Sequence, residues 1–135
     1  MALVSILIPV YNRGAALGNL LQNLRQRTSV DTDFEIIVVD DSGRFAHQEL
    51  TRAACGQYGA TYVEHEKNKG VAAGWNHLTR HTKAPWVILM NDDVEVVPDW
   101  YDALVFSLKA NRGAGMIGLT AYQGVNSSNF TPPPS

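Results

Sequence analysis

The pair Asp92 and Asp93 directly follows Asn91 and an apolar run at residues 86–90. Carboxylate oxygens are hard ligands, and Mg²⁺ usually takes one or two of them together with the phosphate oxygens of a substrate. The alternative is a polar turn that only ends a strand, because Asp is common in turns. A second acidic pair in an equivalent position favours the metal-binding interpretation.

That second pair, Asp40 and Asp41, follows an apolar run at residues 34–39. A carboxylate only accepts hydrogen bonds, so Asp40 is suited to the imide N–H of uracil or thymine, or to a ribose hydroxyl. The alternative is a cap for the next segment, because Asp-Ser-Gly is typical of turns. We expect Asp40 to contact the ligand and Asp41 to form the turn.

Two further features accompany the acidic pairs. Tyr11 follows a third apolar run, at residues 3–9. It could stack on a flat base or pack against the next helix. Residues 68–76 are rich in small side chains, which let a helix N-terminus approach an anion. This segment matches neither GxGxxG nor Gly-Lys-Ser/Thr, and tight helix–sheet packing is the alternative.

Other reactive side chains carry weaker signals. His77 and His81 lie four residues apart, but Leu78 stands where the zinc-protease motif needs Glu, so structural or surface roles are expected. Cys55 is the only cysteine, which excludes an intrachain disulfide. We expect it to be a small core residue in a reducing, cytoplasmic setting.

The elements that position these side chains alternate between strands and helices. Apolar runs predict strands at residues 3–9, 34–39, 60–64, 86–90 and 115–120, with 60–64 nearer an edge. Apolar spacing, small residues and stop signals predict helices at 14–27, 45–58, 71–81 and 99–111. The order indicates an α/β fold, with a mostly parallel sheet and helices on both faces. Ligands bind beyond the carboxyl ends of such strands, so Tyr11 and both acidic pairs should meet at one rim.

Composition narrows the class of protein. The chain has 135 residues, 45% of them hydrophobic, which suits one domain, expected at residues 1–122, and a disordered Pro/Ser/Asn-rich tail at 123–135. The net charge of -2 and the absence of a basic stripe argue against a nucleic-acid binder. No basic leader precedes the first strand and no apolar run is long enough to span a bilayer. We therefore expect no signal peptide, no membrane span and a cytoplasmic location.

Four segments, in this order, resemble family-2 glycosyltransferases with the GT-A fold. They are VSILIPVYNR at 4–13, EIIVVDDS at 35–42, NKGVAAGWN at 68–76 and LMNDDVEVVPDW at 89–100. The resemblance covers nearly the whole chain up to about residue 119. It implies a Rossmann-like nucleotide-diphospho-sugar transferase half, which moves a sugar from a nucleotide diphosphate to an acceptor hydroxyl with inversion. UDP- or dTDP-sugars are the favoured donors, and the acceptor is a saccharide or another hydroxyl compound.

The resemblance also implies roles for single residues on the nucleoside side. Pro9, Tyr11 and Asn12 would flank the nucleoside, with Tyr11 against the base. Asp40 would contact the base. The segment from Gly70 to Asn76 would border the ribose, the diphosphate or the donor sugar.

The metal site is implied in the same way, because Asn91, Asp92 and Asp93 stand at the DXD position of the family. Asp93 would bind Mn²⁺ or Mg²⁺, and Asp92 would face the ribose or the metal. Asn91 replaces the first acid of that motif. Trp75 stands where many members carry Arg before the asparagine at position 76.

No catalytic base is assigned, because family members carry that Asp or Glu in a second half beyond the DXD strand. A non-catalytic nucleotide-sugar-binding module, or a truncated donor half without the base, is the open alternative. A receiver-like signalling domain would place its acidic pair after the first strand, and a nucleotidyltransferase would show a Gly-rich Arg/Lys loop there. Apolar surface left by a missing half would favour a homo-oligomer.

Overall fold

The structure, a computed structural model of the chain, describes residues 3–11, 14–28, 34–40, 45–64, 75–76 and 78–113. The chain divides into two compact units, Met1–Tyr101 and Asp102–Ser135. In the second unit the described residues are 102–113, which form most of a helix and the turn after it. The strand expected at 115–120 and the tail expected at 123–135 lie outside the described residues. The single domain expected over residues 1–122 stays a prediction.

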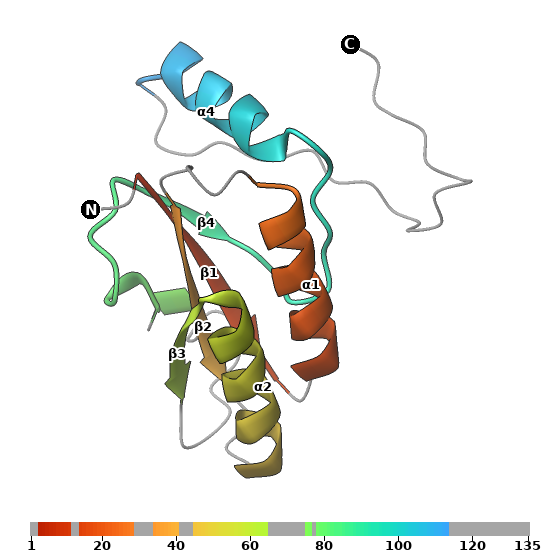
Figure 1. Ribbon diagram of the computed structural model, residues 1–135. Coiled ribbons are helices and arrows are strands. Elements are labelled where there is room, and N and C mark those ends of the chain that lie inside the picture. Colours follow the sequence, from red (N-terminus) through yellow and green to blue (C-terminus); the bar gives the residue numbers. More distant parts are fainter. Residues whose placement is uncertain are drawn as a thin grey trace. The chain divides into compact units, whose positions relative to one another are not determined.

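A parallel sheet forms the centre of the first unit (Figure 1). Its strands, in the order β3-β2-β1-β4, are β1 (Val4–Val10), β2 (Phe34–Asp40), β3 (Thr61–Glu64) and β4 (Trp86–Leu89). Every predicted strand within the described residues is present, and β3 lies at an edge as expected. Strand β4 is one residue shorter than predicted, although the amide of Met90 still donates to the carbonyl of Leu7 at 3.0 Å.

Two helices, α1 (Gly14–Gln26) and α2 (Phe45–Tyr58), pack against each other on the same side of the sheet (Figure 1). This agrees with connectivity, because β1, β2 and β3 are parallel consecutive neighbours and the right-handed crossovers usual between parallel strands put successive helices on one side. Helix α1 presents the buried side chains Leu17, Leu20, Leu21 and Leu24. Burying each one contributes about 1.5–3 kcal/mol to folding.

The other face of the sheet carries a separate apolar cluster. Leu7, Ile37, Val39 and Leu78 are buried together, and Val63 and Trp75 pack against them. Leu7 and Ile37 are paired in the sheet, and alternate residues of a strand point to opposite faces. Helical residues therefore cover both faces, as predicted. The helix expected at 71–81 is described only at 75–76 and 78–79, and Arg80 and His81 already form a turn.

Helix α4 (Trp100–Ala110) begins one residue later than the sequence pattern indicates. Asp99 has φ 62°, a left-handed conformation that a right-handed helix does not contain. Within the first unit, which includes Trp100 and Tyr101, Trp100 Nε1 donates to Thr28 Oγ1 at 2.9 Å. The rings of Tyr101 and Phe34 also lie 5.6 Å apart.

A polar contact ties the amino end of the sheet to the segment before β4. The hydroxyl of Ser5, which is fully buried inside β1, donates to Glu35 Oε1 on β2. Thr82 Oγ1 donates to the same oxygen at 2.9 Å, and the amide of Ala84 donates to Thr82 Oγ1 at 3.0 Å. Within the described residues, no helix is both long enough and apolar enough to cross a membrane.

Candidate functional site

The carboxyl ends of three neighbouring strands bring the predicted site residues to one rim. Asp40 is the last residue of β2, Tyr11 follows β1, and Asp92 follows β4. Strand β1 lies between the other two. The chain runs from β1 towards β3 on one side and returns to β4 on the other, so the strand order reverses between β1 and β4. Open α/β sheets bind their ligands at such a reversal.

Asp40 is fully buried. In the sheet it pairs with Val10 of β1 and with Glu64 of β3, so it lies in the middle of the rim. Its negative charge affects Cys55, which lies on helix α2. Burial first, and then the negative charge of Asp40, raises the pKa of Cys55 to about 12. Cys55 is a buried free cysteine, as the sequence predicted.

The other rim residues differ in exposure. Tyr11 has 46% of its surface exposed, which is compatible both with stacking on a base and with partial packing against the next helix. Asp92 has 7% exposed, whereas Asn91 and Asp93 are exposed on either side of it. The turn after β4 thus directs one carboxylate inward and the next outward. Pro9 is buried within β1, where it pairs with Val39.

The donor set at this turn suits a hard cation that also binds its substrate. Asp92 and Asp93 offer carboxylate oxygens, and Asn91 offers an amide oxygen. No group of three or more His, Cys, Asp or Glu side chains gathers within the part of the chain that the structure describes. Mg²⁺ tolerates such a sparse protein set, because it keeps waters and takes phosphate oxygens from the substrate. The exposed Asp93 therefore offers an oxygen ligand of the type that Mn²⁺ and Mg²⁺ prefer.

The segment after this turn is attached to α1 through Asn23. The amide of Val96 donates to Asn23 Oδ1 at 2.7 Å, and Asn23 Nδ2 donates to the carbonyl of Val96 at 3.3 Å. One side chain thus pairs with both backbone groups of a residue three positions after Asp93. The apolar spacing of α1 gave no sign of this contact, because it joins residues 73 positions apart in the sequence.

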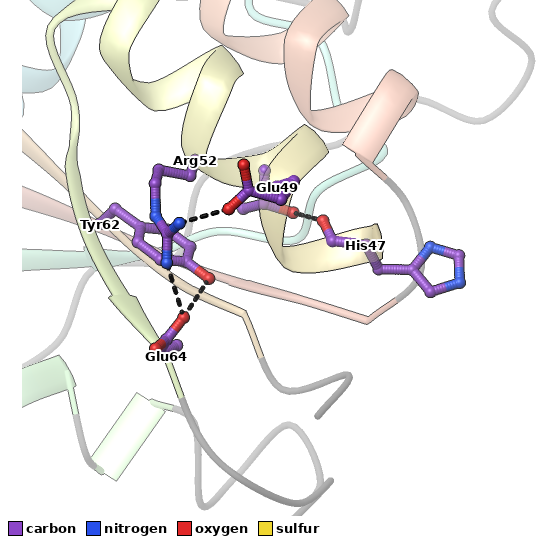
Figure 2. A network of polar contacts seen from close by, with 6 residues as sticks. His47, Glu49, Arg52, Tyr62 and Glu64 are labelled. Atoms are coloured by element: carbon purple, nitrogen blue, oxygen red, sulfur yellow. Dashed lines mark hydrogen bonds and ion pairs between the residues drawn. The ribbon is translucent and has the colours of Figure 1, made fainter. Parts of the chain in front are cut away.

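A second polar network, which was not predicted from the sequence, lies beside the rim between α2 and β3 (Figure 2). The guanidinium of Arg52 donates to Glu49 of the same helix and, at 3.2 Å, to Glu64 at the end of β3. The hydroxyl of Tyr62 donates to the same oxygen of Glu64 at 2.9 Å, and Arg52 lies 5.2 Å from the centre of the Tyr62 ring. The spacing of Glu49 and Arg52, three residues apart on a helix, was the only sequence signal.

This network places the guanidinium of Arg52 beside the described carboxylates at the ends of β2 and β3. Glu64 is the sheet partner of Asp40, so two carboxylates stand on adjacent strand ends. Burial raises the pKa of Tyr62 above its usual value, and the hydrogen bond to Glu64 and the charges of Glu64 and Asp40 raise it further. The positive charge of Arg52 acts in the opposite direction.

The remaining predicted residues are placed only in part. Asn76 is exposed, and Trp75 before it is partly buried against the apolar cluster. His81 lies in an exposed turn. The other predicted positions, which lie outside the described residues, are Asn12, Asp41, Gly70 and His77.

The comparisons with known sequences agree on one family. The family model described as Glycosyl transferase family 2 matches residues 5–134. A Haemophilus influenzae protein named as an uncharacterized glycosyltransferase is 29% identical over 115 residues, which are 85% of this chain and 37% of that protein. An undecaprenyl-phosphate 4-deoxy-4-formamido-L-arabinose transferase of Pseudomonas paraeruginosa is 30% identical over 123 residues, which are 86% of this chain and 34% of that protein. The chain thus spans about a third of the length of these relatives.

Solved structures show a similar fold. Residues 1–349 of Staphylococcus aureus TarS match with a TM-score of 0.70 at 18% identity, over 83% of this chain and 33% of that one. The mannosyltransferase PcManGT of Pyrobaculum calidifontis, solved with GDP-Man and Mn²⁺, matches with a TM-score of 0.70 at 22% identity. That match covers 78% of this chain and 32% of that chain. At these identities the likeness concerns the fold alone, which is of the GT-A type.

Proposed function

The chain belongs to glycosyl transferase family 2, and we propose that it is the donor-binding part of a glycosyltransferase. In this proposal it binds a nucleotide-diphospho-sugar together with Mn²⁺ or Mg²⁺, and the sugar passes to an acceptor hydroxyl with inversion at the anomeric carbon. Membership in the family rests on the match over residues 5–134. The donor, the metal and the acceptor are proposals.

The observation that carries the proposal is the meeting of Asp40, Tyr11 and Asp92 at three adjacent strand ends. A half-exposed tyrosine and a carboxylate at neighbouring strand ends suit a nucleobase, which offers a flat face and N–H donors. The acidic turn after β4 lies across β1 from Asp40 and suits the metal-bound diphosphate. Relatives of this fold support the pairing, since TarS has been solved with UDP and with UDP-GlcNAc, and PcManGT with GDP-Man and Mn²⁺.

The residues would divide the work as follows. Tyr11 stacks on the base, and Pro9 and Asn12 flank the nucleoside. Asp40 accepts a hydrogen bond from the base.

At the metal, Asp93 ligates the cation and Asp92 faces the ribose or the metal. A bound divalent cation supplies Lewis-acid stabilisation of the charge on the leaving diphosphate. Gly70 and Asn76 border the diphosphate or the donor sugar. No residue is assigned as the base that activates the acceptor.

Calorimetric titration tests this proposal. UDP, dTDP, GDP and CDP are each titrated into the chain with Mn²⁺ and with EDTA, and one of them is expected to bind only with the metal. Asp93→Asn should abolish that binding, whereas Asp102→Asn, an exposed carboxylate on α4, should leave it unchanged. If none of the four binds the wild-type chain in Mn²⁺, the proposal is wrong.

A second candidate is a binding module without transfer activity. It is favoured by the share of the relatives that the chain spans, about a third, and by the lack of an assigned base. Release of nucleoside diphosphate from the donor sugar, followed over time with a simple sugar acceptor, separates the two. Binding without turnover favours the module, and turnover favours the enzyme.

A further inference from the structure

Glu64 is the last residue of β3, and two donors hold its side chain in place (Figure 2). Nη2 of Arg52 donates to Oε2 of Glu64 at 3.2 Å, and the hydroxyl of Tyr62 donates to the same oxygen at 2.9 Å. The side chain of Glu64 is 47% exposed, and ion pairs this open to water contribute little to stability. A half-exposed carboxylate that is fixed by two donors is well prepared to contact a ligand.

Glu64 and Asp40 lie side by side at the carboxyl end of the sheet. They are partners in register on the parallel strands β3 and β2, and neighbouring strands lie about 4.8 Å apart. Tyr62 stands two residues before Glu64, so both side chains project from the same face of β3. Burial, then the hydrogen bond to Glu64 and the charges of Glu64 and Asp40, raise the pKa of Tyr62. Both carboxylates therefore act on one small region.

Two carboxylates at this spacing match the hydrogen-bonding edge of one nucleobase. A carboxylate has two acceptor oxygens, and Arg52 and Tyr62 both bind Oε2 of Glu64, so Oε1 can accept a donor from a ligand. Guanine presents two adjacent donors on its Watson–Crick edge, N1–H and the 2-amino group. Uracil and thymine present a single imide N–H between two carbonyl oxygens, and cytosine presents a ring acceptor beside its amino group. The positive charge of Arg52 offsets part of the repulsion between the two carboxylates.

We propose that Glu64 determines the base of the nucleotide donor and selects guanine, by accepting the 2-amino group while Asp40 accepts N1–H. This inference rests on the proposed function, in which Asp40 contacts the base, and adds a second residue to the base site. It differs from the uridine and thymidine donors that the family resemblance favours. A uracil or thymine bound to Asp40 through its imide N–H would turn a carbonyl oxygen towards Glu64, and the two oxygens would repel each other.

Calorimetry in Mn²⁺ first compares the bases on the wild-type chain. GDP should bind at least about tenfold more tightly than UDP, dTDP or CDP. Inosine diphosphate, IDP, differs from GDP only in lacking the 2-amino group, and it should also bind at least about tenfold more weakly than GDP. UDP or dTDP binding as tightly as GDP would overturn the inference and leave the proposed function intact. A chain that binds none of these nucleotides would refute both.

Glu64→Gln then tests the residue itself, because glutamine keeps the shape of the side chain and removes its charge. The ratio of GDP affinity to IDP affinity should fall about tenfold, since only GDP carries the amino group that Glu64 accepts. The melting temperature should stay within about 2 °C of wild type, because the contacts of Glu64 are half exposed. Asp102→Asn, an exposed carboxylate on α4, should leave the ratio unchanged. Equal loss of GDP and IDP affinity in Glu64→Gln, or no loss of either, would overturn the inference.

Discussion

Asn23 on helix α1 pairs with both backbone groups of Val96, at 2.7 Å and 3.3 Å, in the manner of one rung of a β-ladder. Val96 stands three residues after Asp93, so a helix on one face of the sheet fixes the segment that leads away from the acidic turn. We therefore expect Asn23 to contribute both to the stability of the first unit and to the position of the carboxylates.

We expect Asn23→Ala to lower the free energy of unfolding by about 1–2 kcal/mol, since two hydrogen bonds are lost and backbone groups of Val96 are left unpaired. Asn19→Ala, on the exposed side of the same helix, should change it by less than about 0.5 kcal/mol. Urea unfolding measures both. When nucleotide is titrated into the two variants, metal-dependent binding should be weaker for Asn23→Ala and unchanged for Asn19→Ala. Equal behaviour of the two variants in both measurements would contradict the positioning role.

Asp93→Asn and Asp40→Asn should weaken nucleotide binding in different ways. Asp93 is exposed, so its replacement should leave the melting temperature unchanged and remove the stimulation of binding by Mn²⁺. Asp40 is fully buried beside the expected base, so its replacement should weaken binding with and without metal and alter stability as well. Calorimetry in Mn²⁺ and in EDTA separates the two patterns. An Asp40 effect seen only with metal would move that residue out of the base site.

The local elements of this fold and their common rim were predictable, whereas the side-chain contacts between elements were not. Strands β1 and β2 follow from near-continuous apolar runs, and α2 has the bounds that its pattern indicates. By contrast, Asp92 is buried and Asp93 is exposed, although the two residues are identical and adjacent in the sequence. This difference depends on the local backbone geometry, which the residue types do not reveal. Asn23 contacts Val96, and Arg52 contacts Glu64. These contacts join segments that become neighbours only when the sheet has formed in its particular strand order. The late start of α4 depends on a single residue, Asp99, in a left-handed conformation.

The thiol of Cys55 should be unreactive in the folded chain. Burial first, and then the charge of Asp40, raises the pKa of Cys55 from 9.0 to about 12. The unfolded chain loses this proton near pH 9 and the folded chain near pH 12, so the stabilising contribution is complete below pH 9 and is lost as the pH rises between these values.

Two measurements follow for Cys55. At pH 8.5, alkylation by iodoacetamide should be at least about 100-fold slower in the folded chain than in urea, because the thiolate is the reactive form. Between pH 8 and 10.5, the free energy of unfolding should fall more steeply for wild type than for Cys55→Ala. Rapid labelling of the folded chain, or equal pH slopes of the two proteins, would be inconsistent with the raised pKa.

Gly14 and Gly18 on α1 should respond in opposite directions to replacement by alanine. A Cβ built on Gly14 would lie 2.9 Å from Cβ of Leu50 on α2, which is too close for two carbon atoms, and the Leu50 Cβ cannot move without its helix. A Cβ on Gly18 meets nothing within 4 Å. Gly18→Ala should therefore stabilise the chain by about 0.5–1 kcal/mol through helix propensity. Gly14→Ala should destabilise it by about 1–3 kcal/mol through overpacking, because the two helices must separate. Thermal unfolding of the two variants tests this prediction. Helix propensity alone would raise both melting temperatures. The close approach of α1 to α2 should instead lower the melting temperature of Gly14→Ala while that of Gly18→Ala rises.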